Sequence, residues 1–375
     1  MGESSLNLIS VNKPQRINRL KRIALLRISS LLTLPICCFS HSLLAAQDFR
    51  FSGFITAAVA ITDNEETYQG YNNEVNYGHD SIFGLQIDRR LSKDVRVSAQ
   101  LVANDASDFD AAAEWLYIHY QISPTLEFRA GRLRLPIYQA SQHIHVGTSY
   151  LWVAPPPEVY GQAPFTRYHG FDLIHRTQFD DVVLDVQFFS GRVEDEFRFF
   201  GTYLTGESKE LYGINFITEG DNLRTRVTYV DTNFRITATP PLEFSVKFMT
   251  VGLQYEIGNW ETMFEWARRD TDALPIGLSS GAYLTIARSI GDWMPYVTYA
   301  FQESDDDVPA GLKPNTKSVT VGLRFDDVNG LVWKADLHHG KAEDGEAGHF
   351  TFANATNLPE DPTVNLLRLT VSTVF

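Results

Sequence analysis

The chain has 375 residues, of which 44% are hydrophobic and 13% aromatic, and its formal net charge is −14. This composition is too apolar for a disordered chain, and the acidic charge argues against a nucleic-acid binder, which needs a basic face. The mean hydropathy of −0.17 and the lack of a run of about 20 apolar residues after position 46 argue against a multi-helix membrane protein. A transmembrane β-barrel stays compatible, because alternating strands do not raise average hydropathy.

The first segment has the pattern of an export signal. Six basic residues lie within residues 12–27, an apolar stretch follows from Ile28 to Ala46, and small residues end it. This is the order of a cleavable signal peptide, so we predict cleavage after Ala46 and a mature chain of residues 47–375. A helical anchor is the alternative, and Pro35 weakens it. Residues 1–46 hold six Lys/Arg and one acidic residue, so the mature chain has a net charge of −19.

The mature chain continues as segments of about ten residues that alternate apolar with small or polar residues, the period of β-strands. Helical periodicity does not persist for three turns anywhere. The pattern predicts sixteen strands, at residues 49–61, 81–91, 94–104, 112–122, 125–133, 169–178, 182–191, 209–218, 221–231, 244–257, 260–269, 279–289, 292–302, 317–326, 329–339 and 364–375.

Short and long connections alternate between these strands. Every second connection between consecutive strands is a short turn, such as Ser92-Lys93, Asp180-Asp181 or Gly258-Asn259, and the connections between them are longer. Membrane barrels obey this rule, because short turns collect on the periplasmic side and long loops on the outside. We therefore predict an all-β fold, a transmembrane antiparallel up-and-down β-barrel of about 16 strands.

The two faces of each strand differ in polarity. In residues 317–326, Val319, Val321 and Leu323 share one face, and Thr320 and Arg324 lie on the other. An apolar outer face suits lipid and a polar inner face suits a water-filled interior. Aromatic residues near strand ends are expected to form a girdle at the membrane surface, namely Tyr255, Trp260, Trp293, Tyr299 and Trp333.

The last strand alternates and ends in Phe375. It resembles the C-terminal signature of Gram-negative porins, which the barrel-assembly machinery reads. The resemblance implies a cell outer membrane location, contact with outer-membrane lipid and lipopolysaccharide, recognition of Phe375 by that machinery, and a homotrimer. It implies neither a cofactor nor a nucleic-acid partner.

The third long connection, about residues 134–167, is rich in proline and aromatic residues and has a single acid, Glu158. Its flanks, Gly131–Pro136 and Tyr168–Asp172, resemble the matching part of anion-selective porins of the phosphate type. In porins the third outer loop folds into the barrel, and the resemblance implies the same here. An ordered cap outside the lumen is the alternative.

Candidate site residues are the charged groups on predicted inward faces and in this loop. Arginines in a lumen can hold anions, and opposed acids can set up a transverse field. The alternative is that these groups are salt-bridged wall residues. The predicted pore-lining and constriction residues are Arg129, Arg132, Arg134, Glu158, Arg167, Asp172, Arg176, Arg224, Arg226, Arg324 and Arg368.

The combined prediction is a porin that lets small hydrophilic solutes or ions diffuse passively through a water-filled channel. We expect no enzyme activity, no catalytic residues and no metal, since His143 and His145 lack a third ligand. An outer-membrane barrel hydrolase and a plugged structural or adhesion barrel are the alternatives. The loop and its flanks carry four arginines against two acids, which predicts weak anion preference.

Overall fold

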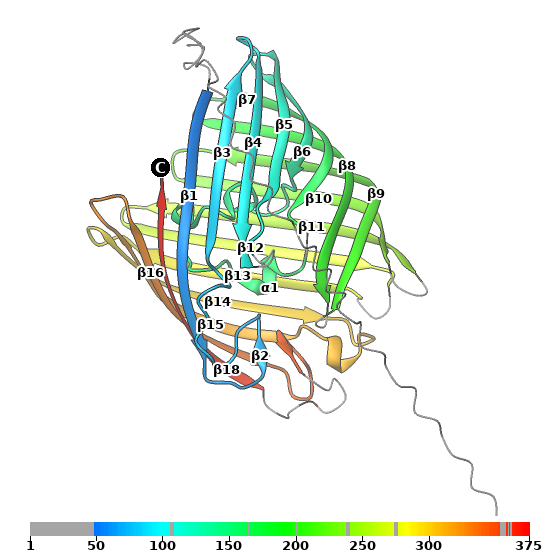
Figure 1. Ribbon diagram of the computed structural model, residues 1–375, viewed down its shortest axis with the longest axis vertical. Helices are drawn as coiled ribbons and strands as arrows, with labels where there is room; N and C mark the ends of the chain where they lie inside the picture. The colour runs from blue at the N-terminus through cyan, green and yellow to red at the C-terminus, as the bar shows by residue number, and fades with distance from the viewer. Residues whose placement is uncertain are drawn as a thin grey trace, which may run out of the picture. The chain divides into compact units, whose positions relative to one another are not determined.

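The computed structural model describes residues 49–375, except 106–108, 164, 200–201, 238–240, 274–276, 353–357, 359 and 361. The predicted signal peptide lies outside the described residues. Sixteen antiparallel strands form one closed barrel in which neighbours in sequence are neighbours in space (Figure 1). The predicted up-and-down barrel of 16 strands is confirmed.

The barrel strands are β1 (Phe49–Thr62), β3 (Ile82–Arg90), β4 (Val95–Asn104), β5 (Ala112–Ser123), β6 (Leu126–Arg134), β7 (Arg167–Phe179), β8 (Val182–Phe199), β9 (Thr202–Glu219), β10 (Leu223–Ile236), β11 (Leu242–Ile257), β12 (Trp260–Thr271), β13 (Ser279–Arg288), β14 (Trp293–Ser304), β15 (Thr316–Asp326), β16 (Val332–Ala342) and β18 (Thr363–Val374). The end of the barrel that carries residues 135–166 is called the loop end below, and the opposite end, with the short turns, is called the turn end.

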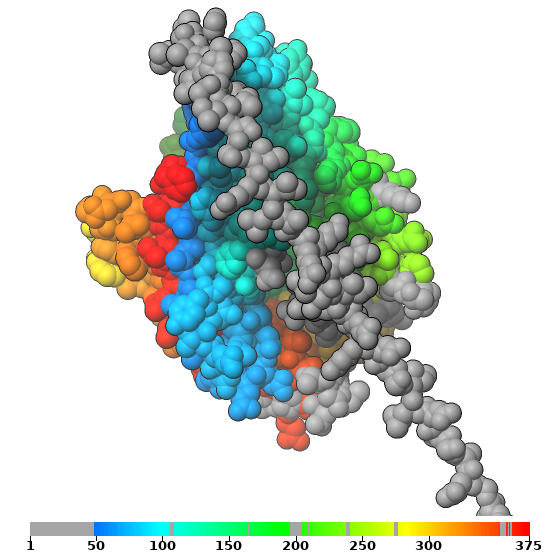
Figure 2. All heavy atoms as spheres, in the orientation of Figure 1, coloured from blue at the N-terminus to red at the C-terminus, as the bar shows by residue number. Residues whose placement is uncertain are grey.

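The first and last strands close the barrel. β1 pairs with β18 from Phe54↔Val374 to Thr62↔Leu366, and its other edge pairs with β3. Figure 2 shows the C-terminal strand against the N-terminal one on the surface. Closure gives every barrel strand two hydrogen-bonded neighbours, so the barrel sheet has no open edge.

Exposure alternates along the strands as the period of two requires. In β18, Leu366 and Arg368 are 0% and 4% exposed, whereas Leu367 and Leu369 are each 45% exposed. The exposed face is therefore apolar and the covered face largely polar. Four of the predicted girdle aromatics lie on this outer wall at 47–49% exposure, and Tyr255 is 39% exposed.

β8 and β9 extend furthest beyond the strands that the sequence pattern predicts. The alternation ends near residue 191 and resumes at 209, but β8 continues to Phe199 and β9 begins at Thr202. The ladder shifts register between Gly191 and Val193 and then continues to the pair Phe199↔Thr202. A bulge of this kind interrupts the period without ending the strand. The prediction of a long connection between residues 191 and 209 is therefore wrong.

The remaining elements lie in the connections. β2 (Thr67–Tyr68) and β17 (Phe350–Thr351) form a small sheet, and η5 (Ala310–Leu312) is a short 3-10 turn. Tyr68, Tyr71 and Phe350 pack in a buried apolar cluster beside this sheet. No helix in the described part of the chain is long and apolar enough to span a membrane.

Candidate functional site

The connection between β6 and β7, residues 135–166, is called the third loop. It contains η3 (Ser141–His143), η4 (Gly147–Ser149) and α1 (Pro157–Tyr160). Its two ends meet where the Leu135 amide donates to the Thr166 carbonyl at 2.8 Å. Pro155 and Pro156 before α1, and Pro157 at its first position, restrict the backbone and leave it few amide donors.

The start of the loop is hydrogen-bonded to covered polar residues of three strands. The Pro136 carbonyl accepts from Asn215 Nδ2 at 2.9 Å and from Arg226 Nη2 at 2.6 Å. The Ile137 carbonyl accepts from Thr250 Oγ1 at 2.6 Å. Since these strand residues are at most 4% exposed, the loop backbone follows the covered face of β9, β10 and β11.

Further anchors hold the loop against β12 to β16. The Gln139 amide donates to Glu265 Oε1 at 2.8 Å. The Trp152 indole donates to Thr285 and Thr298 at 3.0 and 3.1 Å, and Lys334 Nζ donates to the Trp152 carbonyl at 2.6 Å. The buried indole N–H is thus satisfied, as a buried donor must be.

Glu158 lies at the first turn of α1 and is 0% exposed. Ser318 Oγ donates to its Oε1 at 2.5 Å, and burial raises the pKa of this carboxyl group. The Glu158 carbonyl lies where a side chain at Gly281 would begin, 2.3 Å from the position of a Cβ. A glycine on β13 is therefore required for α1 to approach the strand this closely.

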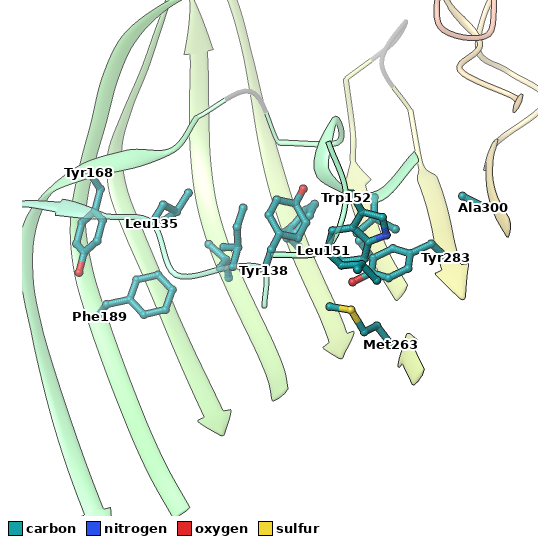
Figure 3. Close-up of a cluster of buried hydrophobic side chains, with 14 of the residues drawn as sticks. Leu135, Tyr138, Leu151, Trp152, Tyr168, Phe189, Met263, Tyr283 and Ala300 are labelled. Carbon is teal, nitrogen blue, oxygen red and sulfur yellow. The ribbon is translucent and has the colours of Figure 1, made fainter. Parts of the chain in front are cut away.

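The barrel also contains an apolar cluster, which the prediction of a polar interior did not include. Leu135, Tyr138 and Trp152 of the third loop pack with strand residues such as Phe189 and Tyr283 (Figure 3). The rings of Trp152 and Tyr283 meet edge to face, with centroids 5.2 Å apart. Because a long loop must bury apolar surface to hold one conformation, the covered face beneath it is apolar in part.

At the base of the loop, one carboxylate joins several basic groups. Glu114 of β5 contacts Arg134 at 2.9 Å, Arg167 at 2.8 Å and His145 at 3.4 Å. Arg167 also pairs with Asp195 at 2.8 Å. Burial lowers the pKa of His145 and Arg134 lowers it further, whereas Glu114 opposes both effects.

Three other predicted arginines form ion pairs with acids on neighbouring strands. Arg129 binds Asp172 through Nε and Nη2 at 2.9 and 2.5 Å. Arg368 binds Asp336 at 2.9 and 3.0 Å, and Arg176 binds Asp185 at 2.7 and 2.6 Å. These bidentate pairs match the fork of the guanidinium to the carboxylate.

Arg224 and Arg324 instead line a cavity of about 370 Å³ between the third loop and the turn end. Arg324 bonds to Asp326 at 2.7 Å and to the Tyr150 carbonyl at 2.9 Å. Arg224 has no ion pair among the described residues. Polar groups of both signs line the rest of this cavity, including His143, Gln254, Glu261 and Asp326.

Arg132 belongs neither to the ion-paired arginines nor to the arginines that line the cavity. It is opposite Leu116 in the ladder, and Leu116 is 54% exposed on the outer wall. The structure thus separates the predicted site residues into paired groups, cavity-lining groups, the loop anchors Arg226 and Glu158, and Arg132.

Several residues that build the site were not singled out from the sequence. Glu114, Asn215, Thr250 and Lys334 are on covered positions of predicted strands, so their face could be inferred from the period. Their partners could not, because the loop that they bind crosses many strands. Among the described residues, no three His, Cys, Asp or Glu side chains are grouped as metal ligands.

Comparisons with known proteins show which solved structures share this fold. No protein-family model and no curated protein matches the sequence. Solved structures do match. An anion-selective porin from Comamonas acidovorans has a TM-score of 0.63 at 13% identity, covering 87% of this chain and 99% of that chain.

Two further structures agree with this result. OmpF of Salmonella typhi, in complex with daunomycin, has a TM-score of 0.61 at 10% identity, with 87% and 97% of the two chains covered. The outer membrane channel DcaP of Acinetobacter baumannii has a TM-score of 0.61 at 9% identity, with 88% and 97% covered. The chain therefore has the fold of Gram-negative outer-membrane porins.

Proposed function

We propose that the protein is an outer-membrane porin through which small hydrophilic solutes or ions diffuse passively. One observation carries the proposal: a closed 16-stranded barrel with an apolar outer wall has a cavity lined by Arg224, Arg324, Glu261 and Asp326 beside the third loop. Barrels of this size leave space that side chains do not fill. Charged groups around that space are the means by which pores select solutes.

In this proposal the third loop narrows the lumen. Its hydrogen bonds to covered residues of β9 through β16 support that position. The solute path passes the cavity beside Tyr150 and Trp152, where Arg224 and Arg324 face the acids Glu261 and Asp326. The paired arginines at positions 129, 134, 167, 176 and 368 hold the wall in shape and contribute to the field as ion pairs.

The proposal includes the route to the membrane. Residues 1–46 direct export and are removed, and the barrel of residues 47–375 is assembled through a C-terminal strand ending in Phe375. The apolar outer wall contacts outer-membrane lipid and lipopolysaccharide. A homotrimer is proposed as well, and OmpT of Vibrio cholerae, solved in a trimer form, supports it with a TM-score of 0.56 at 10% identity.

Planar-bilayer recording tests the channel. Purified, folded protein of residues 47–375 should give discrete conductance steps in KCl, and heat-denatured protein from the same preparation should give none. If the folded protein inserts but conducts no ions, it is not a diffusion channel.

A plugged barrel is the second candidate, and the packing of the third loop favours it. Leu135, Tyr138 and Trp152 join a buried apolar cluster with residues of the barrel strands. A loop fixed in this way can close a lumen instead of narrowing it. The same recordings separate the two, because a plugged barrel inserts without conductance steps.

A further inference from the structure

A second cavity, of about 300 Å³, lies in the loop-end half of the barrel. The third loop forms one wall, with Leu135, Ile137 and Phe165. Strands β8 to β12 form the others. Its volume is about twice that of an engineered apolar cavity that takes up benzene, so an aromatic ring with a short chain fits.

The strand walls of this cavity are mostly apolar on the face that encloses it, and among the lining residues of β8 to β11 only Ser208 and Thr232 are polar. The lining residues at the loop end of β10 are Val230, Thr232, Phe234 and Ile236, and those of β11 are Phe244, Val246 and Phe248. Only Thr232 in this set is polar. A lumen face that served only to hold water would carry polar side chains at these positions.

The opposite face of the same strands is polar. Arg235 of β10 pairs with Glu207 of β9 and Glu243 of β11, both at 3.5 Å. The usual polarity of a membrane barrel, apolar outside and polar inside, is therefore reversed at the loop end of β9 to β11. The outward residues at this end are charged and suit contact with water, not with lipid. The apolar residues lie on the inward face, so lipid contact cannot account for them. Their role is to enclose the cavity.

Two close approaches shape the aromatic side of the cavity. The rings of Phe165 and Phe234 have centroids 4.9 Å apart, and those of Phe234 and Phe244 are 5.5 Å apart. Gly206 of β9 leaves the space that the Phe234 ring occupies, since a Cβ there would lie 2.4 Å from that ring. The cavity thus offers ring faces and edges to a ligand.

One cation borders this apolar cavity. Arg269 of β12 donates from Nη1 to the Gln162 carbonyl at 3.0 Å, and its buried Nε has no hydrogen-bond partner. Among the described residues no carboxylate lies within ion-pair distance of it. A guanidinium has five N–H donors in a planar fork that fits a carboxylate. The cavity therefore suits a ligand that combines an anionic group, for Arg269, with an apolar group, for the lining side chains.

We propose that this cavity binds small amphipathic carboxylates, with an aromatic or branched apolar group among Phe165, Phe234 and Phe244 and the carboxylate at Arg269. The proposal adds a binding step to the proposed diffusion channel and names a solute class for it. Binding in this cavity does not require conduction, so each can be tested separately.

Calorimetric titration of the full barrel in nanodiscs tests the proposal with 3-phenylpropanoate as the probe. Its neutral amide, 3-phenylpropanamide, tests the charge, and propanoate tests the ring. We expect binding of 3-phenylpropanoate with a negative heat-capacity change, and binding of the other two weaker by about tenfold or more. This series uses only the unmodified protein. Equal affinity for acid and amide, or no binding at millimolar probe, overturns the proposal.

Arg269→Gln should weaken 3-phenylpropanoate binding by about tenfold or more, because it removes the charge-assisted contact. Arg268→Gln is the matched control, since it removes the same charge one residue away on the exposed face of β12. Equal loss in both variants overturns the assignment of Arg269. Absence of conductance steps alongside specific binding overturns the channel and leaves the binding site standing.

Discussion

At Glu158 the buried carboxyl group has a different role from the one that the sequence suggested. The side chain is fully buried under α1 and accepts a hydrogen bond from Ser318, while its Oε2 has no partner. Burial raises its pKa. A group whose folded-state pKa is raised contributes stability that is complete below its unfolded value, about 4.5, and is lost as pH rises through the folded value.

Glu158→Gln should therefore stabilise the loop at neutral pH, because it keeps an acceptor for Ser318 without a buried charge. The expected gain in the free energy of unfolding at pH 8 is on the order of 1 kcal/mol, with little change at pH 4. Urea denaturation at the two pH values measures it, and Glu303→Gln, at an exposed position, is the control. A loss of stability at pH 8 contradicts the prediction.

His145 responds to pH in the opposite direction. Its imidazole is buried beside Arg134, and both burial and this arginine lower its pKa, while Glu114 partly compensates. Arg167 also repels the protonated form. The folded protein thus binds fewer protons here than the unfolded chain, so stability is complete above about pH 6.5 and declines as pH falls through the lowered value.

We expect His145→Gln to reduce the loss of stability between pH 7.5 and pH 5.5. Urea midpoints at the two pH values should differ less in this variant than in the unmodified protein. His175→Gln, at an exposed position on β7, should leave the difference unchanged. If His145→Gln keeps the full difference, protonation of His145 does not control the loop.

At the scale of elements, the sequence predicted which segments form strands better than it predicted where those strands begin and end. The period of two located all sixteen barrel strands, because lipid and interior impose opposite polarity on alternate residues. It ended β8 too early and began β9 too late, since a bulge and the charged residues Glu194 and Asp195 interrupt the pattern. The small sheet of β2 and β17 was not predicted, because two residues carry no period.

The third loop is the element whose removal tests the proposed constriction. Leu135 and Thr166 are hydrogen-bonded at its base, so a short Gly-Ser linker can replace residues 138–163. Single-channel conductance should rise, because the Trp152 anchors to Thr285 and Thr298 are lost and the lumen widens. Unchanged conductance from a correctly assembled barrel would place the constriction elsewhere. A heat-dependent mobility shift on gels establishes that the variant barrel is assembled.

For the whole molecule, the sequence did not predict which acidic residue pairs with which arginine. Faces follow from the period, but which acid meets which arginine depends on register and on the course of the third loop. Glu114 and Asp195 neutralise Arg134 and Arg167, and Asp172 neutralises Arg129. Of the four arginines that made up the local excess inferred from the sequence, only Arg132 has no ion pair among the described residues. Arg224 of β10 likewise has no ion pair among them.

Ion selectivity should follow these unpaired groups and not the net charge of −19 of residues 47–375. Acidic residues such as Glu65, Glu66 and Asp305 lie in connections at the loop end, where salt screens charge beyond about 8 Å. Arg224 lines the cavity with Arg324, so its charge acts at close range in a medium of lower dielectric constant. We predict weak anion preference in the reversal potential across a KCl gradient. Arg224→Glu should shift the potential toward cations, whereas Arg132→Glu, opposite Leu116 on the outer wall, should not. Strong cation selectivity of the unmodified protein, or equal shifts in the two variants, would show that charges other than those of this cavity set the selectivity.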